Sequence, residues 1–89
     1  MDETTASVDD AVRSAFASEL FLPFDQVTAD APLAALAGLD SVTLLRIIVV
    51  LETEYWIALD DEQLYGLTTV GDVIALVDET LRARAGVGG

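Results

Sequence analysis

The sequence contains no cysteine and no histidine among its 89 residues. This absence excludes disulfides, thiolate nucleophiles, the usual zinc and copper ligands, and the side chain that most often transfers protons near neutral pH. Basic residues are also scarce, since 4 Lys+Arg stand against 16 Asp+Glu and give a net charge of −12. A surface for DNA or RNA would have to oppose the field of the whole molecule. We therefore expect neither nucleic acid nor a resident metal ion as a partner, and most enzyme mechanisms are excluded.

Long hydrophobic runs are missing too, although 53% of the residues are apolar. The longest stretch, residues 42–51, is interrupted by Thr43 and Arg46. It is far shorter than the roughly 20 apolar residues that cross a membrane. Residues 1–4 lack the basic start and the apolar run of a secretory signal. The sequence therefore predicts a packed cytoplasmic protein that does not enter the membrane.

Apolar residues at helical spacing predict an all-α fold. A first helix covers about residues 7–20, with Ser7 and Asp10 as its capping box. The periodicity is lost over residues 21–40, which predicts a long ordered loop. Because loops of this length are unusual in small domains, we expect apolar residues of the loop to hold it against the core. These residues are Val27, Leu33, Leu36 and Leu39.

The rest of the chain predicts a second main helix over residues 40–55, a short helix, and a closing helix. The acidic residues 60–62 begin the short helix, which carries Leu64 and Leu67. Two threonines cap the last helix, which runs from residue 70 to about 82, with Arg82 and Arg84 favourably placed near its C-terminal end. Residues 85–89 should fray. The prediction is a monomeric four-helix bundle, one domain over residues 1–89 with an ordered core at about 7–82.

The second main helix has two apolar faces when its residues are placed at 100° per residue. The inner face consists of Leu44, Ile47, Ile48, Leu51 and Tyr55. The outer face consists of Val42, Leu45, Arg46, Val49 and Thr53. An ordinary surface helix is charged and polar on its outer side, so an apolar outer stripe predicts a partner-binding surface. Burial of the helix nearly all round is the alternative.

The segment Gly38-Leu39-Asp40-Ser41-Val42 is where small, polar and helix-starting residues converge. Gly38 permits a turn and Asp40 is a good helix cap. Ser41 presents its hydroxyl at a first helical turn, where backbone N–H groups lack intrahelical partners and favour a phosphate. Taken alone, Asp40 and Ser41 are better explained by a simple N-cap than by a phosphate site.

The chain as a whole resembles an acyl carrier protein. Carriers of this family have a helix, a long loop, a Gly-x-Asp-Ser-Leu-type motif that opens the second helix, a short third helix and a closing fourth. Here the segment LAALAGLDSVTLLRIIVVLE lies about halfway along, and LDDE and LTTVGDVIALV follow in the expected order. The resemblance covers approximately residues 7–82.

The resemblance implies that Ser41 is the attachment point of 4′-phosphopantetheine, transferred from coenzyme A by a separate phosphopantetheinyl transferase with magnesium. Gly38, Leu39 and Asp40 complete the motif, and Asp40 is also a candidate for the transferase docking site. The thiol of the arm would hold an acyl group as a thioester, so the chain is a carrier and not an enzyme. Expected partners are an acyltransferase, a ketosynthase, or an adenylating enzyme or ligase.

Two further groups of residues follow from the resemblance. The partner-binding candidates are Val42, Leu45, Arg46 and Val49, which agrees with the outer face derived above. The candidates for lining a space that sheathes the acyl chain are Leu33, Leu51, Leu59, Leu64 and Leu67, for which a plain core role is the alternative.

The chain departs from the fatty-acid carriers at two places. Those carriers usually have acids along the exposed side of the second helix, where this chain has Thr43, Arg46 and Thr53. A charge of changed sign alters partner choice, which favours a specialised pathway of the polyketide type. Trp56 is also atypical, and we interpret it as a lid over the core rather than a partner contact.

Two other interpretations remain open at this stage. An aminoacyl or peptidyl carrier of a nonribosomal-peptide-type pathway shares the fold, the serine and the arm, although such carriers more often read Gly-Gly-Asp/His-Ser. From a different class, an acidic helical interaction domain without a prosthetic group explains the outer stripe and the charge equally well. It does not explain the position of Ser41 in the motif.

Overall fold

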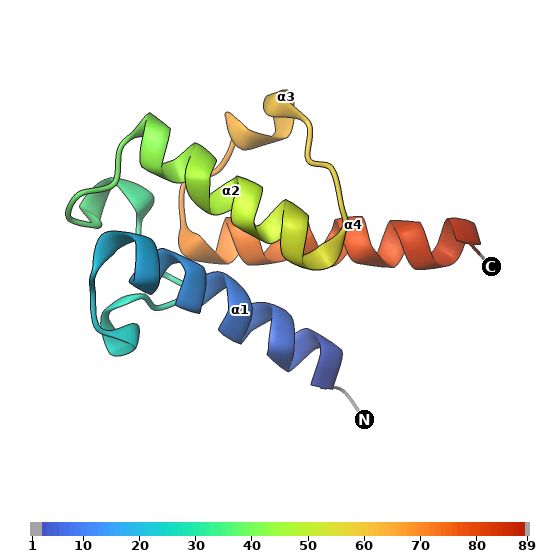
Figure 1. The fold of residues 1–89 in the computed structure, drawn as a ribbon, viewed down its shortest axis with the longest axis horizontal. Helices are drawn as coiled ribbons and strands as arrows, with labels where there is room; N and C mark the ends of the chain where they lie inside the picture. The colour runs from blue at the N-terminus through green and yellow to red at the C-terminus, as the bar shows by residue number, and fades with distance from the viewer. Residues whose placement is uncertain (1–2, 89) are drawn as a thin grey trace.

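The computed structural model describes the backbone of residues 3–88 and the side chains of residues 8–60 and 62–84. Over that range the elements are α1 (Glu3–Leu20), the 3-10 turns η1 (Phe24–Gln26) and η2 (Leu33–Ala35), α2 (Ser41–Tyr55), α3 (Asp61–Leu64) and α4 (Val70–Gly88). Helix α1 packs against both α2 and α4, while α3 stands at the edge of the bundle beside α2 (Figure 1). The predicted all-α fold with a short third helix is confirmed.

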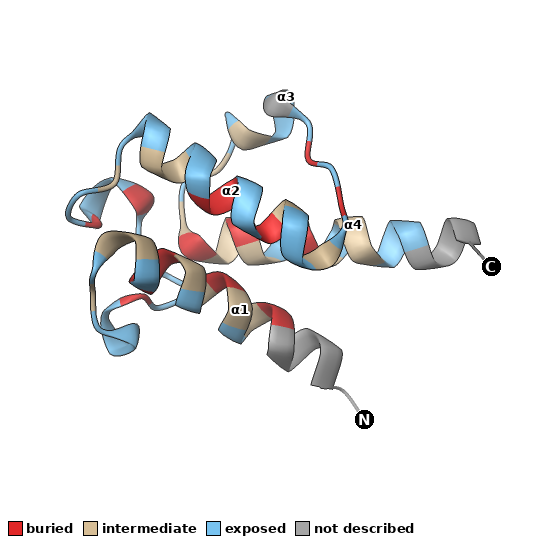
Figure 2. Cartoon of the chain, in the orientation of Figure 1, coloured by how far each residue is buried: buried red, intermediate tan, exposed pale blue. Residues whose placement is uncertain are grey.

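The core lies where the apolar stripes of α1, α2 and α4 converge (Figure 2). Phe16 of α1, Ile47 of α2 and Val73 of α4 are fully buried. On α2 the inner face is confirmed, because Ile47, Ile48 and Leu51 are buried whereas Leu44 and Tyr55 are half-buried. The periodicity of the sequence therefore predicted the rotation of this helix correctly.

The long first loop is fastened to the start of α4. The backbone N–H of Leu33 donates to the carbonyl oxygen of Thr68 at 2.8 Å, and that of Val70 donates to Ala31 at 3.0 Å. Gly71 makes this approach possible, since a Cβ there would lie 2.9 Å from the carbonyl oxygen of Ala29. The expectation that the loop is held to the core is confirmed. Of the four apolar residues expected to hold it, Val27, Leu33 and Leu36 are buried and Leu39 is half-buried.

Arg13 attaches the first part of the loop to α1, a role that the sequence did not indicate. Its Nε donates to the carbonyl oxygen of Val27 at 2.6 Å. The guanidinium lies 4.0 Å from the ring centroid of Phe24 and 3.4 Å from Asp9. One of the few basic side chains is thus used to order a loop.

Helices α1 and α2 both end on an aromatic residue in the left-handed region. Phe21 and Trp56 each have φ of 57°, at the position after the helix where glycine is usual. The next backbone N–H groups donate back, from Leu22 to Ala17 at 3.0 Å and from Ile57 to Glu52 at 3.1 Å. This is the hydrogen bond of a Schellman motif.

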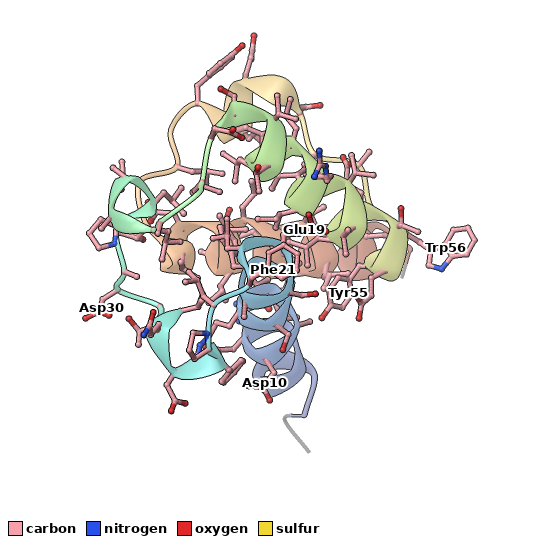
Figure 3. All side chains as sticks on the ribbon, turned by 60° about the vertical axis from the view of Figure 1, so that its left-hand side comes forward. Asp10, Glu19, Phe21, Asp30, Tyr55 and Trp56 are labelled. Atoms are coloured by element: carbon pink, nitrogen blue, oxygen red, sulfur yellow. The ribbon has the colours of Figure 1, made fainter. Side chains whose placement is uncertain are left out.

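The Schellman turn explains why the lid interpretation of Trp56 is wrong. The turn directs Ile57 into the core, where it is 9% exposed, and leaves Trp56 86% exposed. Figure 3 shows the indole extending away from the bundle. The atypical tryptophan therefore covers nothing in the fold.

Several predicted helix ends also require correction. Helix α1 begins at Glu3, so Ser7 lies inside it and does not cap it; the Ser7 side chain is outside the described residues. Helix α3 ends at Leu64, so Leu67 lies in the turn that follows. The capping box of α3 joins Asp60 and Gln63.

The frayed tail predicted from residue 85 is wrong as far as residue 88, because α4 continues to Gly88; residue 89 is outside the described chain. One glycine costs a helix only about 1 kcal/mol relative to alanine, and no proline ends it. Arg84 is therefore not at the end of α4. Its Nη1 instead donates to the carbonyl oxygens of Tyr55 at 2.9 Å and Trp56 at 2.6 Å, so it caps α2.

Candidate functional site

Ser41 is the first residue of α2 and its side chain is exposed. The backbone before it is fixed by Asp40, whose Oδ1 accepts the Thr43 N–H at 2.8 Å. This hydrogen bond lowers the pKa of Asp40 below its ordinary value of 3.8, so the carboxylate is charged at neutral pH. The predicted N-cap is confirmed, and Ser41 stands beside a fixed negative charge at a helix start.

Gly38 makes the sharp turn that leads into this helix. Its φ is +85°, in the region that favours glycine over residues with a Cβ. The position of a Cβ there would be 3.8 Å from Cδ2 of Leu20, so space is not the constraint and backbone conformation is. Leu39 follows and is half-buried, which ties the turn to the core.

Ser41 opens onto a groove of about 840 Å³ between the start of α2, η2 and the segment that follows α3. Most of its lining is apolar. The lining residues are Leu33, Ala34, Leu39, Asp40, Ser41, Leu44, Leu45, Leu64, Tyr65, Leu67 and Thr68. An exposed hydroxyl at the edge of an apolar groove is suited to carry a flexible group whose end reaches into that groove.

The predicted acyl-pocket residues separate into two sets. Leu33, Leu64 and Leu67 line the groove beside Ser41. Leu51 and Leu59 are not among its lining residues, and both are buried in the core, at 0% and 8% exposure. Leu51 is more than two helical turns from Ser41, and the fold places the groove only at the first turns of α2.

Tyr65 is a large groove residue that the sequence did not indicate. It follows α3 directly and is 87% exposed. A single tyrosine after a short helix gives no periodic signal. Only the three-dimensional path from α3 to α4 brings it to the same groove as Ser41.

The outer face of α2 is exposed, so the alternative of a helix buried all round is wrong. Val42 is 62% exposed, Leu45 is 50% exposed and Val49 is 56% exposed. The Arg46 side chain is 64% exposed, and its Nη1 lies 3.9 Å from Oε1 of Glu19 on α1. Leu45 belongs both to this face and to the groove.

Other kinds of site find little support in the described part of the chain. Among the side chains of residues 8–60 and 62–84, no three carboxylates are grouped to hold a metal ion. Within the described helices, none combines the length and apolar character needed to cross a membrane.

Comparison with known proteins decides between a carrier and an interaction domain. Residues 10–77 match a family model described as a phosphopantetheine attachment site. The chain belongs to the acyl carrier protein family. It is 32% identical over 73 residues to an acyl carrier protein of Akkermansia muciniphila. The aligned residues make up 82% of this chain and 91% of that relative. It is 34% identical over 65 residues to an acyl carrier protein of Saccharopolyspora erythraea, covering 73% and 68%.

A solved structure also supports membership of this family. The solution structure of a holo acyl carrier protein from Geobacter metallireducens superposes with a TM-score of 0.75 and 27% identity, covering 86% of this chain and 88% of that one. Members of the family are non-catalytic carriers with a covalent 4′-phosphopantetheine, so this chain is a carrier and not an enzyme. An interaction domain without a prosthetic group does not account for the match.

Proposed function

We propose that Ser41 is the residue that carries 4′-phosphopantetheine in this acyl carrier. The observation that supports it is the combination of an exposed hydroxyl at the first residue of α2 with the apolar groove beside it. In the transfer from coenzyme A, the Ser41 oxygen forms a phosphoester bond to the phosphorus that bears the pantetheine, the pyrophosphate bond of coenzyme A breaks, and adenosine 3′,5′-bisphosphate leaves. The proton of the hydroxyl goes to a base on the transferase, because this chain has no imidazole. Magnesium, which the transferase uses, belongs to that enzyme.

The residues around Ser41 have separate roles in this proposal. Gly38 and Leu39 fix the turn, and Asp40 holds the helix start through Thr43. Asp40 also offers part of its exposed carboxylate to the transferase. When bound, the arm supplies a thiol that holds an acyl group as a thioester. The chain then raises the effective concentration of that group at its partner enzymes.

Intact-protein mass tests the attachment. The apo chain is incubated with coenzyme A, magnesium and a broad-specificity phosphopantetheinyl transferase. We expect a gain of one phosphopantetheinyl group in the native chain and in Ser18→Ala, which removes an exposed serine of α1. We expect no gain in Ser41→Ala. Modification of Ser41→Ala, or none of the native chain by a transferase active on other carriers, would overturn the proposal.

We also propose that the cargo is an acyl group of a polyketide-type pathway, with an acyltransferase, a ketosynthase or a ligase as partners. The names of the relatives support an acyl cargo, and the absence of acids on the outer face of α2 supports a specialised pathway. An aminoacyl or peptidyl carrier is the second candidate. The holo protein is offered in parallel to a malonyl-type acyltransferase and to amino-acid-adenylating enzymes, and the thioester that forms identifies the class.

We further propose that the groove receives the cargo through Leu33, Leu64 and Leu67. NMR methyl shifts of these three leucines should change when the arm carries a medium-length acyl chain, relative to the unloaded holo protein. Leu51, which lies outside the groove in the core, serves as the reference. Equal shifts at Leu51 and Leu64 would indicate a general change in packing and contradict the groove assignment.

A further inference from the structure

The side chain of Tyr65 serves no evident purpose in the fold. It lines the groove beside Ser41, yet it is 87% exposed. Within the described part of the chain, no hydrogen bond or ion pair involves its hydroxyl. An aromatic ring left in water contributes no hydrophobic free energy to the folded monomer. The place of Tyr65 at the groove therefore points to a role toward the molecule that the groove holds.

The other polar side chains of the groove are already engaged. Asp40 caps α2, and a charged carboxylate accepts hydrogen bonds but donates none. The hydroxyl of Thr68 donates to Oδ2 of Asp72 at 2.8 Å. The hydroxyl of Ser41 loses its proton when the arm is attached. Among the described side chains that line the groove, Tyr65 is therefore the one that keeps a free donor.

The rest of the groove is aliphatic. Leucines supply most of this surface, among them Leu33, Leu64 and Leu67. A hydrocarbon chain lies on such a surface without needing a polar partner. A chain that carries a carbonyl group is different, because burying a carbonyl oxygen without a hydrogen bond is costly. A donor at the groove removes this cost for a carbonyl within its reach.

The ring of Tyr65 is free to turn toward the groove. Exposed side chains change rotamer within nanoseconds or less, and the fold does not pack against this one. Water competes for the phenol while the groove is empty, so the hydroxyl is satisfied in that state. When a chain displaces this water, a hydrogen bond from the phenol becomes electrostatically stronger.

We propose that Tyr65 is a specificity-determining residue, whose phenol donates a hydrogen bond to a keto oxygen of the acyl chain and so allows the groove to hold oxo-acyl cargo. This inference rests on the proposed function, because it requires an acyl chain attached at Ser41 and received by the groove. It names a substrate class, a chain with a keto group, that an aliphatic groove alone would disfavour.

The test compares two cargoes of equal length, octanoyl and β-oxo-octanoyl, loaded onto the apo chain from their coenzyme A thioesters. The NMR methyl signals of Leu64 and Leu67 report the ratio of inserted to free chain. Tyr65→Phe should lower this ratio about three- to tenfold for the β-oxo cargo, because one hydrogen bond is lost. It should leave the ratio for octanoyl unchanged. With carbon-13 at the keto carbon, the downfield shift caused by the hydrogen bond should disappear in Tyr65→Phe.

Tyr65→Leu is the matched variant that removes the ring together with the hydroxyl. If Tyr65→Phe behaves like the native chain and only Tyr65→Leu lowers the ratio, the cargo meets the ring and the inference is overturned. An equal loss for both cargoes in Tyr65→Phe would overturn it too, and so would a β-oxo cargo that does not enter the groove of the native chain. Thermal unfolding should be the same in all three chains, since Tyr65 is exposed.

Failure of the proposed function gives a different result. If the transferase does not modify the native chain with either cargo, the attachment at Ser41 is wrong. If octanoyl is attached but leaves Leu64 and Leu67 unmoved, the groove does not receive the cargo. The inference about Tyr65 falls in both cases. It falls alone when octanoyl enters the groove and Tyr65→Phe has no selective effect on the β-oxo chain.

Discussion

The two faces of α2 have similar aliphatic composition and opposite environments. Ile47, Ile48 and Leu51 are at most 2% exposed against α1 and α4, whereas Leu45 and Val49 on the other side are 50% and 56% exposed. The type of residue therefore does not decide which face is buried. The rotation of the helix decides it, and neighbouring elements fix that rotation.

The difference separates stability from recognition within one helix. The inner face contributes the hydrophobic free energy that holds the bundle together. The outer face leaves apolar surface in water, which gains nothing for the folded monomer and favours a partner. Substitutions of the same chemical kind on the two faces should consequently have different effects.

The largest expected difference is between two leucine truncations in α2. Leu51→Ala leaves a cavity in the core and should lower the free energy of unfolding by about 2–5 kcal/mol. Leu45→Ala makes the same change at a half-exposed position and should alter it by about 0.5 kcal/mol or less. Denaturant unfolding of both variants measures the difference. Equal destabilisation would mean that the outer face is part of the core.

The second prediction concerns Arg84, which binds the carbonyl oxygens at the C-terminal end of α2. These hydrogen bonds help to fix the rotation of α2 about its own axis. Arg84→Ala removes the hydrogen bonds to Tyr55 and Trp56 and should cost about 0.5–1.5 kcal/mol. Arg82→Ala, two residues earlier, breaks an exposed ion pair with Asp78 and should cost about 0.5 kcal/mol or less. Thermal unfolding compares them. A larger loss for Arg82→Ala would contradict the capping role of Arg84.

The third prediction concerns pH and the two carboxylates that cap α2 and α4. The hydrogen bond from the backbone N–H of Thr43 lowers the pKa of Asp40 below its ordinary value of 3.8. Hydrogen bonds from Thr68 and Thr69 lower the pKa of Asp72 in the same way. The carboxyl groups of Asp40 and Asp72 therefore bind a proton more weakly in the folded state than in the unfolded chain. The stability they contribute is complete above the unfolded pKa and is lost as pH falls through the folded one.

The test is to follow unfolding from about pH 5 downward in the native chain and in a variant with Asp40→Asn and Asp72→Asn. Asparagine keeps an oxygen acceptor for each cap but does not titrate there. We expect the native chain to lose more stability than the variant over this range. Identical pH slopes would show that the caps are not linked to folding.

The smallest expected effect is that of salt. The chain has 16 acidic and 4 basic residues, and repulsion among the acids opposes the compact state at low ionic strength. Moderate salt or divalent cations should therefore raise Tm by screening that repulsion. Arg46→Met should show the same rise in Tm. The outer face of α2 carries no acidic residue, so the repulsion that salt screens lies elsewhere in the chain. An unchanged Tm between low and moderate salt would contradict the prediction.

Much of the candidate site was visible in the sequence because its signals are local. Asp40 caps the helix three residues before the N–H that it accepts, and Gly38 takes the left-handed turn that few other residues favour. The inner and outer faces of α2 follow from a fixed angle per residue. The groove was only half predicted, because Leu51 and Leu59 share the residue type of Leu64 but not its place.

The sequence by itself determined the all-α class, the four helices, the exposed serine motif and the sign of the molecular charge, since each depends on composition or short-range periodicity. Only the tertiary structure decided which distant groups meet. It brought Tyr65 to the groove of Ser41, Arg84 to the end of α2, and Gly71 against the first loop. These contacts join segments far apart along the chain, and no local pattern encodes a distance that depends on how helices pack.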